Sequence, residues 1–435
     1  MKIMLTYPSF SLLNPKKGSP LGLAALGACL EESGHKVKII DPSVERYNFK
    51  TLINKIKEFD PDVLGVNVLT VLVYDAYRIV RVIKKINPNC LTVFGGPHPT
   101  ILPEDVLKEC FELDVVVRGE GEITFDELVN NYEKNIDFSK IRGISYRNND
   151  KIIHNPNRPL IDDLDILPFP AYHLLPLEKY KLKRTTTTGI EGYGTYIFTS
   201  RGCPYNCNFC SCRTLWGKQW RTRSPEKILE EVKILKERYN FNLIEFSDDT
   251  FTISKKRTEK ICNLIRKENM DINWSCSTRV EMINKELVTM LKNSNCYLIA
   301  YSIESAQQQS IDFLCKGFTV QQIIDATKTV KKSGLQAMTN IIIGIPGETK
   351  GHINNTIRFA EKLDFDFVYS NILTPLPGTK LLEYAEKNDM LITRDWSKYT
   401  TTHPVMKIPG IRSFELKGFL IKANMKFMLS KNIFF

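Results

Sequence analysis

The 435-residue chain lacks any run that approaches the roughly 18 uninterrupted apolar residues of a membrane-spanning helix. Its first residues, MKIMLTYPSF, lack the long apolar core and the small-residue cleavage site of a secretory signal peptide. We therefore expect a cytoplasmic protein. Hydrophobic residues make up 43% and charged residues 25% of the chain, which argues against a disordered chain, a coiled coil and a collagen-like fibre.

The chain also lacks a basic cluster. Its formal net charge of +11 is spread along the sequence, and the longest unbroken basic run is Lys255-Lys256-Arg257. Basic segments that bind nucleic acid typically hold about five to eight Lys or Arg residues together. We therefore expect a generally basic surface and no nucleic-acid partner.

Cysteines are plentiful, and their spacing is uneven. A chain with eleven cysteines and no export signal favours metal or redox chemistry over disulfides. Seven cysteines are dispersed, whereas four lie within the ten residues 203–212. These four are the natural place to look for a cofactor.

The spacing Cys203-x3-Cys207-x2-Cys210 is the most specific feature of the chain. A [4Fe–4S] cluster is normally held by four cysteines, so three leave one iron open to bind and reduce a substrate. Zinc would need four ligands, commonly two Cys-x2-Cys halves, and no second half lies at a suitable distance. Cys212 would need a cramped loop to bind as well, so we expect a bystander. The motif, with Phe209 before its last cysteine, resembles that of the radical S-adenosylmethionine (SAM) superfamily, in which the open iron chelates SAM.

Residues 1–135 alternate short apolar strands with amphipathic helices, which predicts a parallel sheet covered on both faces. The expected strands are 2–6, 37–40, 62–68, 91–94 and 114–117. The expected helices are 21–33, 49–58, 74–86 and one from residue 123. Ligands of such sheets bind outside the carboxyl ends of the strands, so these ends are candidate binding positions.

Polar residues and glycines gather at several of these strand ends. Paired glycines let the backbone approach a large flat ligand without a Cβ clash. Each residue alone could be an ordinary turn residue, but together they favour a binding site. The candidates are Tyr7, Thr70, Gly95, Gly96, His98, Gly119, Glu120 and Gly121.

Three segments in this region, SPLGLAALGACLEESGHKVKIID, FGGPHPT and VVRGEGEITFDELV, resemble the cobalamin-binding domain that precedes the barrel in one branch of radical SAM enzymes. The resemblance implies a Rossmann-like (flavodoxin-like) cobalamin-binding domain and assigns the strand-end candidates to cobalamin. The Asp-x-His-x-x-Gly loop that supplies a lower axial histidine is missing after the first strand, where the sequence has YPSFSLLNP. We therefore expect base-off cobalamin without histidine on cobalt. His98 could be a ligand, but we favour a hydrogen-bonding role in its loop.

Residues 136–192 carry several prolines and polar turns, and we expect a connecting strap without its own core. Six strands then alternate with six helices over residues 193–390, which predicts a partial (β/α)6 barrel of the TIM type followed by an extension, residues 391–435. The expected strands are 196–200, 243–247, 272–278, 297–303, 337–343 and 367–373. The expected helices are 225–238, 254–268, 285–294, 321–333, 350–363 and 380–388.

The carboxyl ends of the barrel strands carry further candidates. Carboxylates at Asp248 and Glu304 could accept hydrogen bonds from the SAM ammonium or ribose. Arg279 could pair with the SAM carboxylate, and Gly344 would let the backbone face adenine. Each residue taken singly is more often a cap or an ion-pair partner. In this order after the cluster motif they resemble the SAM-contacting positions of the family, although Ala306 replaces the glycine that often follows Glu-Ser.

The resemblance covers roughly residues 1–400. It implies methylation of an unactivated carbon of a small-molecule or lipid substrate, through a 5′-deoxyadenosyl radical and methylcobalamin. A cobalamin-dependent cyclase or rearrangement enzyme without methyl transfer is the alternative. A methylthiolating RNA-modifying enzyme would carry a second cluster, for which Cys29, Cys90 and Cys110 are too dispersed, and an electron carrier has no use for an open iron. A flavodoxin or ferredoxin is the expected reductant.

Residues 413–435 interleave apolar side chains with Lys417, Lys422, Lys426 and Lys431. A basic amphipathic helix of this kind can lie on an anionic membrane surface, which would suit a lipid or isoprenoid substrate and a membrane-associated protein. The alternative, which we favour, is a terminal helix that packs on the barrel.

Overall fold

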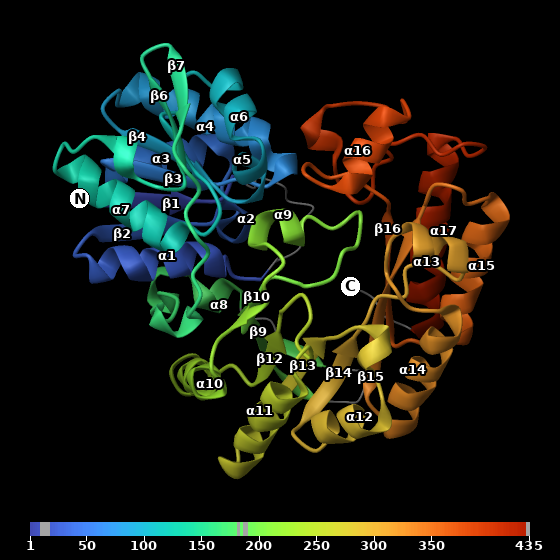
Figure 1. The fold of residues 1–435 in the computed structure, drawn as a ribbon. Coiled ribbons are helices and arrows are strands. Elements are labelled where there is room, and N and C mark those ends of the chain that lie inside the picture. Colours follow the sequence, from blue (N-terminus) through green and yellow to red (C-terminus); the bar gives the residue numbers. More distant parts are fainter. Residues whose placement is uncertain (9–17, 181–182, 186–189, 432–435) are drawn as a thin grey trace. The chain divides into compact units, whose positions relative to one another are not determined.

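The computed structural model describes residues 1–8, 18–180, 183–185 and 190–431 (Figure 1). The chain divides into two compact units. The first comprises Met1–Leu182 with Thr214–Trp216, and the second comprises Lys183–Arg213 with Gly217–Phe435. In the part of the chain that is described, each unit is built around a seven-stranded sheet.

The first unit has the strand order β2-β1-β3-β4-β5-β6-β7. Strands β1 to β5 are parallel in the order typical of flavodoxin-like folds, which confirms the predicted class. The strands are β1 (Lys2–Thr6), β2 (Lys36–Ile40), β3 (Val63–Asn67), β4 (Leu91–Gly95), β5 (Val115–Val117), β6 (Ile144–Asn148) and β7 (Lys151–His154). The helices are α1 (Leu21–Glu32), α2 (Pro42–Glu45), α3 (Phe49–Phe59), α4 (Val73–Ile86), α5 (Pro97–Ile101), α6 (Pro103–Glu109), α7 (Gly121–Glu133) and α8 (Leu177–Tyr180).

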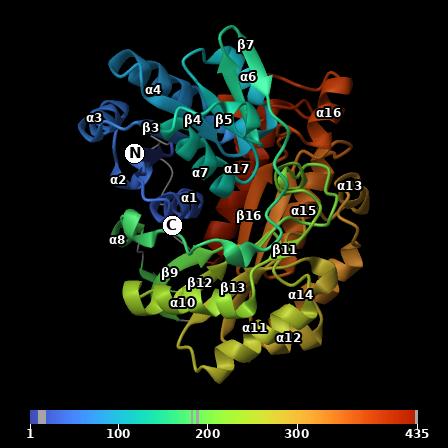
Figure 2. The ribbon, with the colours of Figure 1, turned by 60° about the vertical axis from the view of Figure 1, so that its left-hand side comes forward.

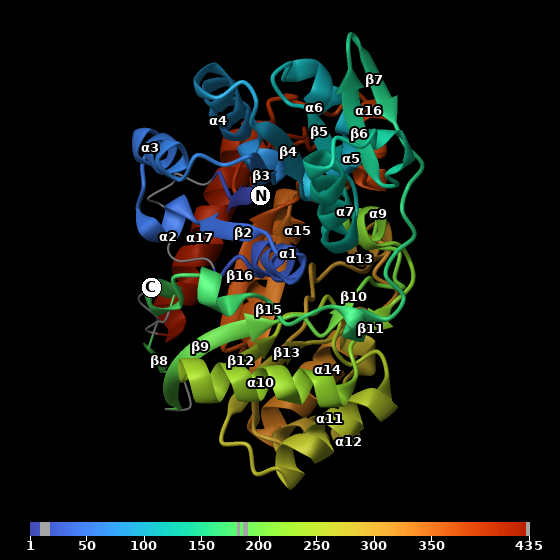
Figure 3. The same cartoon turned by 90° about the vertical axis from the view of Figure 1, so that its left-hand side faces the viewer.

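Both faces of this sheet are covered by helices. Helix α1 packs with α7 and α3 packs with α4, and Figure 3 shows the two pairs on opposite sides of the strands. The strands are short apolar runs such as Ile3–Leu5, which is fully buried because a parallel sheet is covered on both sides.

Part of the segment that we expected to be a bare strap belongs to this sheet. Strand β6 pairs antiparallel with β5, and β7 pairs antiparallel with β6. The prolines that suggested a strap lie after this hairpin, from Pro156 onward, whereas the hairpin itself has the buried residues Ile144–Tyr146. The hairpin, residues 144–154, therefore extends the first sheet.

The second unit has the order β16-β15-β14-β13-β12-β9-β8. Strands β9 and β12 to β16 are parallel, six in the described chain, and they curl into the expected partial barrel with the helices outside (Figure 2). The strands, with a separate β10–β11 pair, are β8 (Lys183–Thr185), β9 (Glu191–Ile197), β10 (Ser200–Arg201), β11 (Arg221–Thr222), β12 (Leu243–Phe246), β13 (Asn273–Ser277), β14 (Cys296–Ala300), β15 (Gln336–Ile343) and β16 (Phe367–Ile372). The helices from here on are α9 (Cys212–Trp216), α10 (Pro225–Tyr239), α11 (Lys255–Lys267), α12 (Lys285–Lys292), α13 (Gln308–Phe313), α14 (Val320–Ser333), α15 (Lys350–Lys362), α16 (Lys380–Lys387) and α17 (Ser413–Lys431).

The first barrel strand begins at Glu191, earlier than the predicted residue 196. Two glycines hide its start from an apolar pattern. A Cβ at Gly192 would lie 2.2 Å from Asn242 Oδ1, and that same oxygen accepts a hydrogen bond from the Tyr193 backbone N–H at 2.8 Å. The glycine is therefore needed for the close approach of this side chain to the strand.

Local sequence explains why the six main barrel helices begin where they do. Each has an N-cap side chain that accepts a hydrogen bond from a backbone N–H three residues later, which satisfies an otherwise unpaired donor. The caps are Ser224, Ser254, Asn284, Thr319, Thr349 and Thr379. Such caps fix where each loop joins its helix, and these loops carry the candidate site residues.

The C-terminal helix α17 packs on β15, β16 and α15 through one face (Figure 1). Leu416, Leu420 and Phe427 are buried on that face, and Lys350 pairs with Glu415 at 2.5 Å. The favoured expectation of a helix that packs on the barrel therefore holds for this face. Ile433 and Phe434, which we counted in the predicted helix, lie outside the described residues. No helix in the described chain is long and apolar enough to span a membrane.

Candidate functional site

The three cysteines of the motif lie on one loop between β10 and α9. No cysteine in the described chain forms a disulfide; Cys203 and Cys207 are half-buried and Cys210 is exposed. Three thiols on one short accessible loop are a suitable donor set for an iron–sulfur cluster.

The cysteine loop (residues 203–210) is fastened to two distant parts of the same unit through Asn208. Its backbone N–H and its side-chain amide donate to the carbonyl oxygens of Leu314 and Phe313, at 3.3 and 2.5 Å. The backbone carbonyl of Asn208 accepts a hydrogen bond from the backbone N–H of Leu381 at 2.9 Å. Sequence analysis missed Asn208, because its partners are more than 100 positions away in the chain.

Arg279 lies beside this loop rather than on an open surface. Its guanidinium stacks 3.7 Å from the ring centre of Tyr205, and Nη1 lies 3.7 Å from Cys207 Sγ. Its Nε donates to Glu281 Oε1 at 2.5 Å. The structure therefore places Arg279 near the cluster loop, and its predicted contact with the SAM carboxylate stays a prediction.

Glu304 is buried and already paired. It adopts a left-handed backbone conformation with φ of 60°, and Oε1 lies 2.8 Å from Lys316 Nζ. Lys316 is itself only 9% exposed. Sequence analysis missed this lysine, although its position between Cys315 and Gly317, close to apolar residues, is unusual for a solvated lysine.

Asp248 has an internal role that competes with the predicted one. Its carboxylate oxygens accept hydrogen bonds from the backbone N–H and the hydroxyl of both Thr199 and Ser200. The residue is 4% exposed, and burial raises the pKa of its carboxyl even though Arg257 opposes the shift. Asp248 therefore ties the end of β9 to the start of β10, just before the cysteine loop, and has little capacity left for SAM.

Gly344 faces the C-terminal helix, and its predicted contact with adenine stays a prediction. Its φ is +82°, and a Cβ would lie 3.0 Å from a methyl of Leu416 and 3.4 Å from Ile408. The missing side chain makes room for α17. Gly347 has φ of +89° and open space around it, so it is the freer of the two glycines.

At the carboxyl edge of the first sheet, Gly96 is packed against the end of β3. Its φ is +95°, and a Cβ would lie 2.4 Å from Asn67 Oδ1 and 3.0 Å from the Val68 nitrogen. Asn67 Oδ1 is buried and has no hydrogen-bond partner in the described chain. An unsatisfied buried acceptor at this edge fits a ligand that carries N–H donors, such as the amide side chains of a corrin.

His98 lies next to Gly96 and is buried, at 1% exposure. Its Nδ1 lies 3.2 Å from Thr70 Oγ1, and its backbone N–H donates to the Val68 carbonyl at 3.2 Å. Burial lowers the pKa of its ring to about 4, so the imidazole is neutral near pH 7. His98 thus joins the loops that follow β3 and β4.

The remaining candidates of the first unit hold different positions. Glu120 Oε2 accepts a hydrogen bond from the Ile161 backbone N–H at 2.7 Å, which anchors the chain after β7. Gly121 leaves room for Leu26, whose methyl would lie 3.0 Å from a Cβ. By contrast, Gly119 has φ of +75° and open space. Gly95 ends β4, and Tyr7 follows β1 at the switch point of the sheet, where ligands of such folds bind.

The cysteines fit a cluster better than a single ion. Within the described ranges, no three Cys, His, Asp or Glu side chains converge on one metal position. A cubane spreads its ligands over separate irons, so this does not count against a cluster. Cys212, the expected bystander, hydrogen-bonds Cys203 and lowers its pKa, and its Sγ lies 2.8 Å from Asp249 Oδ2. Whether Cys212 stays out of the cluster remains a prediction.

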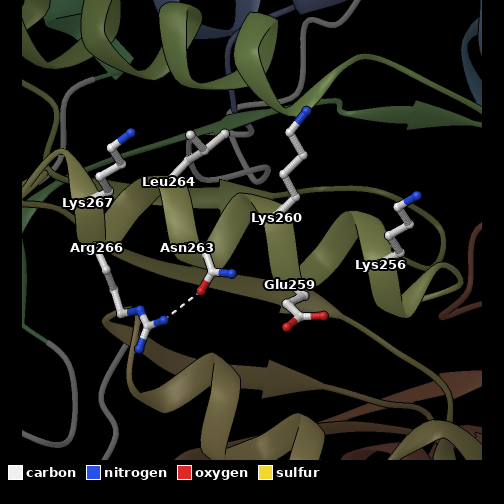
Figure 4. A pocket seen from close by; sticks show the side chains of 7 residues that line it. All are labelled: Lys256, Glu259, Lys260, Asn263, Leu264, Arg266 and Lys267. Atoms are coloured by element: carbon white, nitrogen blue, oxygen red, sulfur yellow. Dashed lines mark hydrogen bonds between the residues drawn. The ribbon is translucent and has the colours of Figure 1, made fainter.

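An open hollow on the outer face of α11 carries none of this chemistry (Figure 4). Its walls are mainly basic, and Arg266 Nη2 lies 2.6 Å from Asn263 Oδ1. The lining residues are Lys256, Glu259, Lys260, Asn263, Leu264, Arg266 and Lys267. This is a solvated helix face, to which the longest basic run contributes Lys256.

Comparison with protein families matches both units. Residues 15–129 match the B12 binding domain, and residues 197–360 match the radical SAM superfamily. An uncharacterized methyltransferase of Pyrococcus horikoshii is 44% identical over 100% of this chain and 94% of its own length. An anaerobic magnesium-protoporphyrin IX monomethyl ester cyclase of Rubrivivax gelatinosus is 28% identical over 99% of this chain and 78% of its own length.

Among solved structures, the fold resembles the radical SAM methyltransferase TsrM of Kitasatospora setae, which was solved with cobalamin and a [4Fe–4S] cluster bound. The TM-score is 0.78 at 16% identity, over 97% of this chain and 90% of that one. The likeness therefore extends over both units as a fold.

Proposed function

The chain belongs to the radical SAM enzymes that carry a B12-binding domain, and on this premise we propose that it transfers a methyl group to an unactivated carbon of its substrate. Its cofactors are those of that family: a [4Fe–4S] cluster, SAM and cobalamin. The full-length match with a methyltransferase carries the choice of methyl transfer. The match with an anaerobic cyclase keeps a cyclase or rearrangement as the second candidate.

The residues of the chain have distinct parts in this proposal. When bound, the cluster and SAM supply the 5′-deoxyadenosyl radical that abstracts hydrogen, and cobalamin supplies the methyl group. Cys203, Cys207 and Cys210 hold the cluster, and Asn208 fixes the loop that carries them. Asn67 and Gly96 shape the cobalamin edge of the first sheet.

Anaerobic reconstitution of the full chain tests the methyl transfer. The protein would be loaded with iron, sulfide and cobalamin, reduced, and incubated with SAM carrying a deuterated methyl group and a fractionated extract of its source cells. We expect a product that gains one labelled methyl, together with S-adenosylhomocysteine and 5′-deoxyadenosine. Deoxyadenosine without S-adenosylhomocysteine would exclude methyl transfer and favour the cyclase alternative.

We further propose a lipid substrate that the enzyme meets at an anionic membrane surface. The support is an apolar stripe on the outer face of α17, formed by Phe414, Ile421, Met425 and Met428, which are between 43% and 62% exposed. Lys417 is exposed beside it, and basic residues beside an apolar stripe suit anionic headgroups, whereas Lys422 and Lys426 contact Asn354 and Glu361 of α15. The stripe is separate from the face that packs on the barrel.

Vesicle flotation with the full chain tests the membrane contact. Serine at Phe414, Ile421 and Met425 should reduce flotation with vesicles of phosphatidylglycerol and phosphatidylcholine. Ile166→Ser is the matched control, because Ile166 is 63% exposed in the first unit. Equal flotation of the triple variant and this control would reject the contact.

We also propose a flavodoxin or ferredoxin as the electron donor, which is tested by replacing dithionite with either protein.

A further inference from the structure

The segment after α13 forms a platform against which the cysteine loop rests. This platform segment, residues 313–318, accepts the two hydrogen bonds that Asn208 donates, through the carbonyl oxygens of Phe313 and Leu314. Arg279 Nη2 donates to a third carbonyl of the platform, that of Lys316. The backbone of the platform therefore fixes both the loop and the arginine that lies beside Cys207.

The side chain of Lys316 is the one charged group that the platform contributes within its own six residues. Its Nζ lies 6.0 Å from the ring centre of Phe209, the residue before Cys210, and 5.6 Å from that of Phe318. Attraction between an ammonium and an aromatic ring strengthens when water is excluded, as it is here. The ammonium group of Lys316 therefore lies near Phe209 of the cysteine loop and near Phe318 of the platform itself.

This lysine keeps its charge in spite of its burial. Burial alone would lower the pKa of Lys316, but Glu304 and Cys207 outweigh it, and the pKa is raised. Glu304 supplies the pairing charge at 2.8 Å and is itself 4% exposed. Removing one partner of such a pair leaves the other as an uncompensated buried charge.

Two opposite charges thus lie fixed close to the position where the three cysteines would hold a cluster. When the cluster takes one electron from an external donor, its net charge becomes more negative by one and no bond breaks. A nearby positive charge stabilises the reduced form and a nearby negative charge destabilises it, with an effect that is larger in a buried setting than in water.

We propose that the Lys316–Glu304 pair is a positioning and electrostatic element that sets how easily the cluster is reduced. The inference rests on the proposed function in one respect, because it requires the cluster to bind at Cys203, Cys207 and Cys210. It adds to that function a residue, Lys316, that acts on the cluster through charge and through the Phe209 contact.

The test is a redox titration of the reconstituted full chain without SAM, followed by electron paramagnetic resonance with dithionite as reductant. Lys316→Met should shift the midpoint potential of the cluster to more negative values, because Glu304 is left uncompensated. Glu304→Gln should shift it to more positive values, because Lys316 is left uncompensated. Lys316→Arg should stay closer to the wild type than Lys316→Met does. Lys328→Met, at an exposed lysine of α14, is the control and should not shift the potential.

Opposite shifts of the midpoint potential in Lys316→Met and Glu304→Gln distinguish a charge effect from structural damage. The effect of structural damage would not change direction with the sign of the charge that is removed. Shifts in the same direction, or no shift with cluster content unchanged, would overturn the proposal. If Lys316→Met loses its cluster, the sign of the shift in Glu304→Gln decides alone. A wild-type chain that binds no cluster would instead overturn the proposed function, and a wild-type chain that binds one but transfers no methyl leaves this test intact.

Discussion

The buried ring of His98 makes a pH-dependent contribution to stability that can be calculated. Its pKa falls from an ordinary 6.5 to about 4 because the ring is buried, beside Thr70. Between these values the unfolded chain binds a proton that the folded chain does not, so stability decreases as the pH falls from 6.5 toward 4. Above pH 6.5 the ring is neutral in both states and the contribution is complete.

The size of the effect follows from the two pKa values. Each unit of difference corresponds to about 1.4 kcal/mol, which gives about 3 kcal/mol in total and about 2 kcal/mol between pH 7.5 and pH 5. We expect His98→Asn to lose this part of the pH dependence, because asparagine can replace the Thr70 hydrogen bond but does not titrate. His173→Asn should keep it, since His173 is exposed.

Urea unfolding at pH 7.5 and pH 5, followed by hydrogen exchange of peptides from β3 and β4, measures the effect within the first unit. The quantity to compare is the change in unfolding free energy between the two pH values, in the wild type and in each variant. An equal change in the wild type and in His98→Asn would refute the assignment of a buried neutral ring.

Three further outcomes follow from the geometry. Replacing any cysteine of the three-cysteine motif by Ala should abolish the cluster absorption band after reconstitution while any corrin band remains, whereas Cys212→Ala should keep the cluster band. Gly96→Ala should cost about 2–3 kcal/mol in urea unfolding, because its Cβ would meet Asn67 Oδ1 at 2.4 Å, whereas Gly119→Ala, in open space, should cost about 1 kcal/mol. Glu348→Gln should lower the unfolding free energy by about 1–3 kcal/mol, because the buried Glu348 carboxylate accepts hydrogen bonds from two serine hydroxyls and a backbone N–H. Equal urea midpoints for the wild type and this variant would contradict this.

The strands and helices of both sheets could be predicted because their apolar patterns are local. The six barrel helices begin at polar caps that are visible in the sequence, such as Ser254 and Thr319. The start of β9 could not be predicted, because Gly192 is required by Asn242, a residue 50 positions away. The β6–β7 hairpin was missed because the prolines that follow it dominated the composition of that segment.

The candidate site could be predicted as a set of loops but not in its contacts. The cysteine motif has a fixed local spacing, whereas the groups that hold its loop come from distant segments. Arg279 reaches Cys207 across 72 positions, and Asn208 reaches Phe313 across 105. Lys316 was overlooked for this reason, since only the barrel topology brings its segment to the loop that follows β10.

Parallel topology also explains why structural and ligand-binding residues look alike in the sequence. All the strand-end loops of a barrel lie at one edge, so a carboxylate there is a candidate ligand whatever its actual partners are. Asn67 is the last residue of the parallel strand β3, and Asp248 lies two residues after the parallel strand β12, but they differ in what their oxygens meet. The oxygens of Asp248 accept from Thr199 and Ser200, whereas Asn67 Oδ1 is buried without a partner in the described chain. Because an unsatisfied buried acceptor carries a cost that a bound donor removes, Asn67 is the stronger candidate for a ligand contact, although its residue type is the less conspicuous of the two.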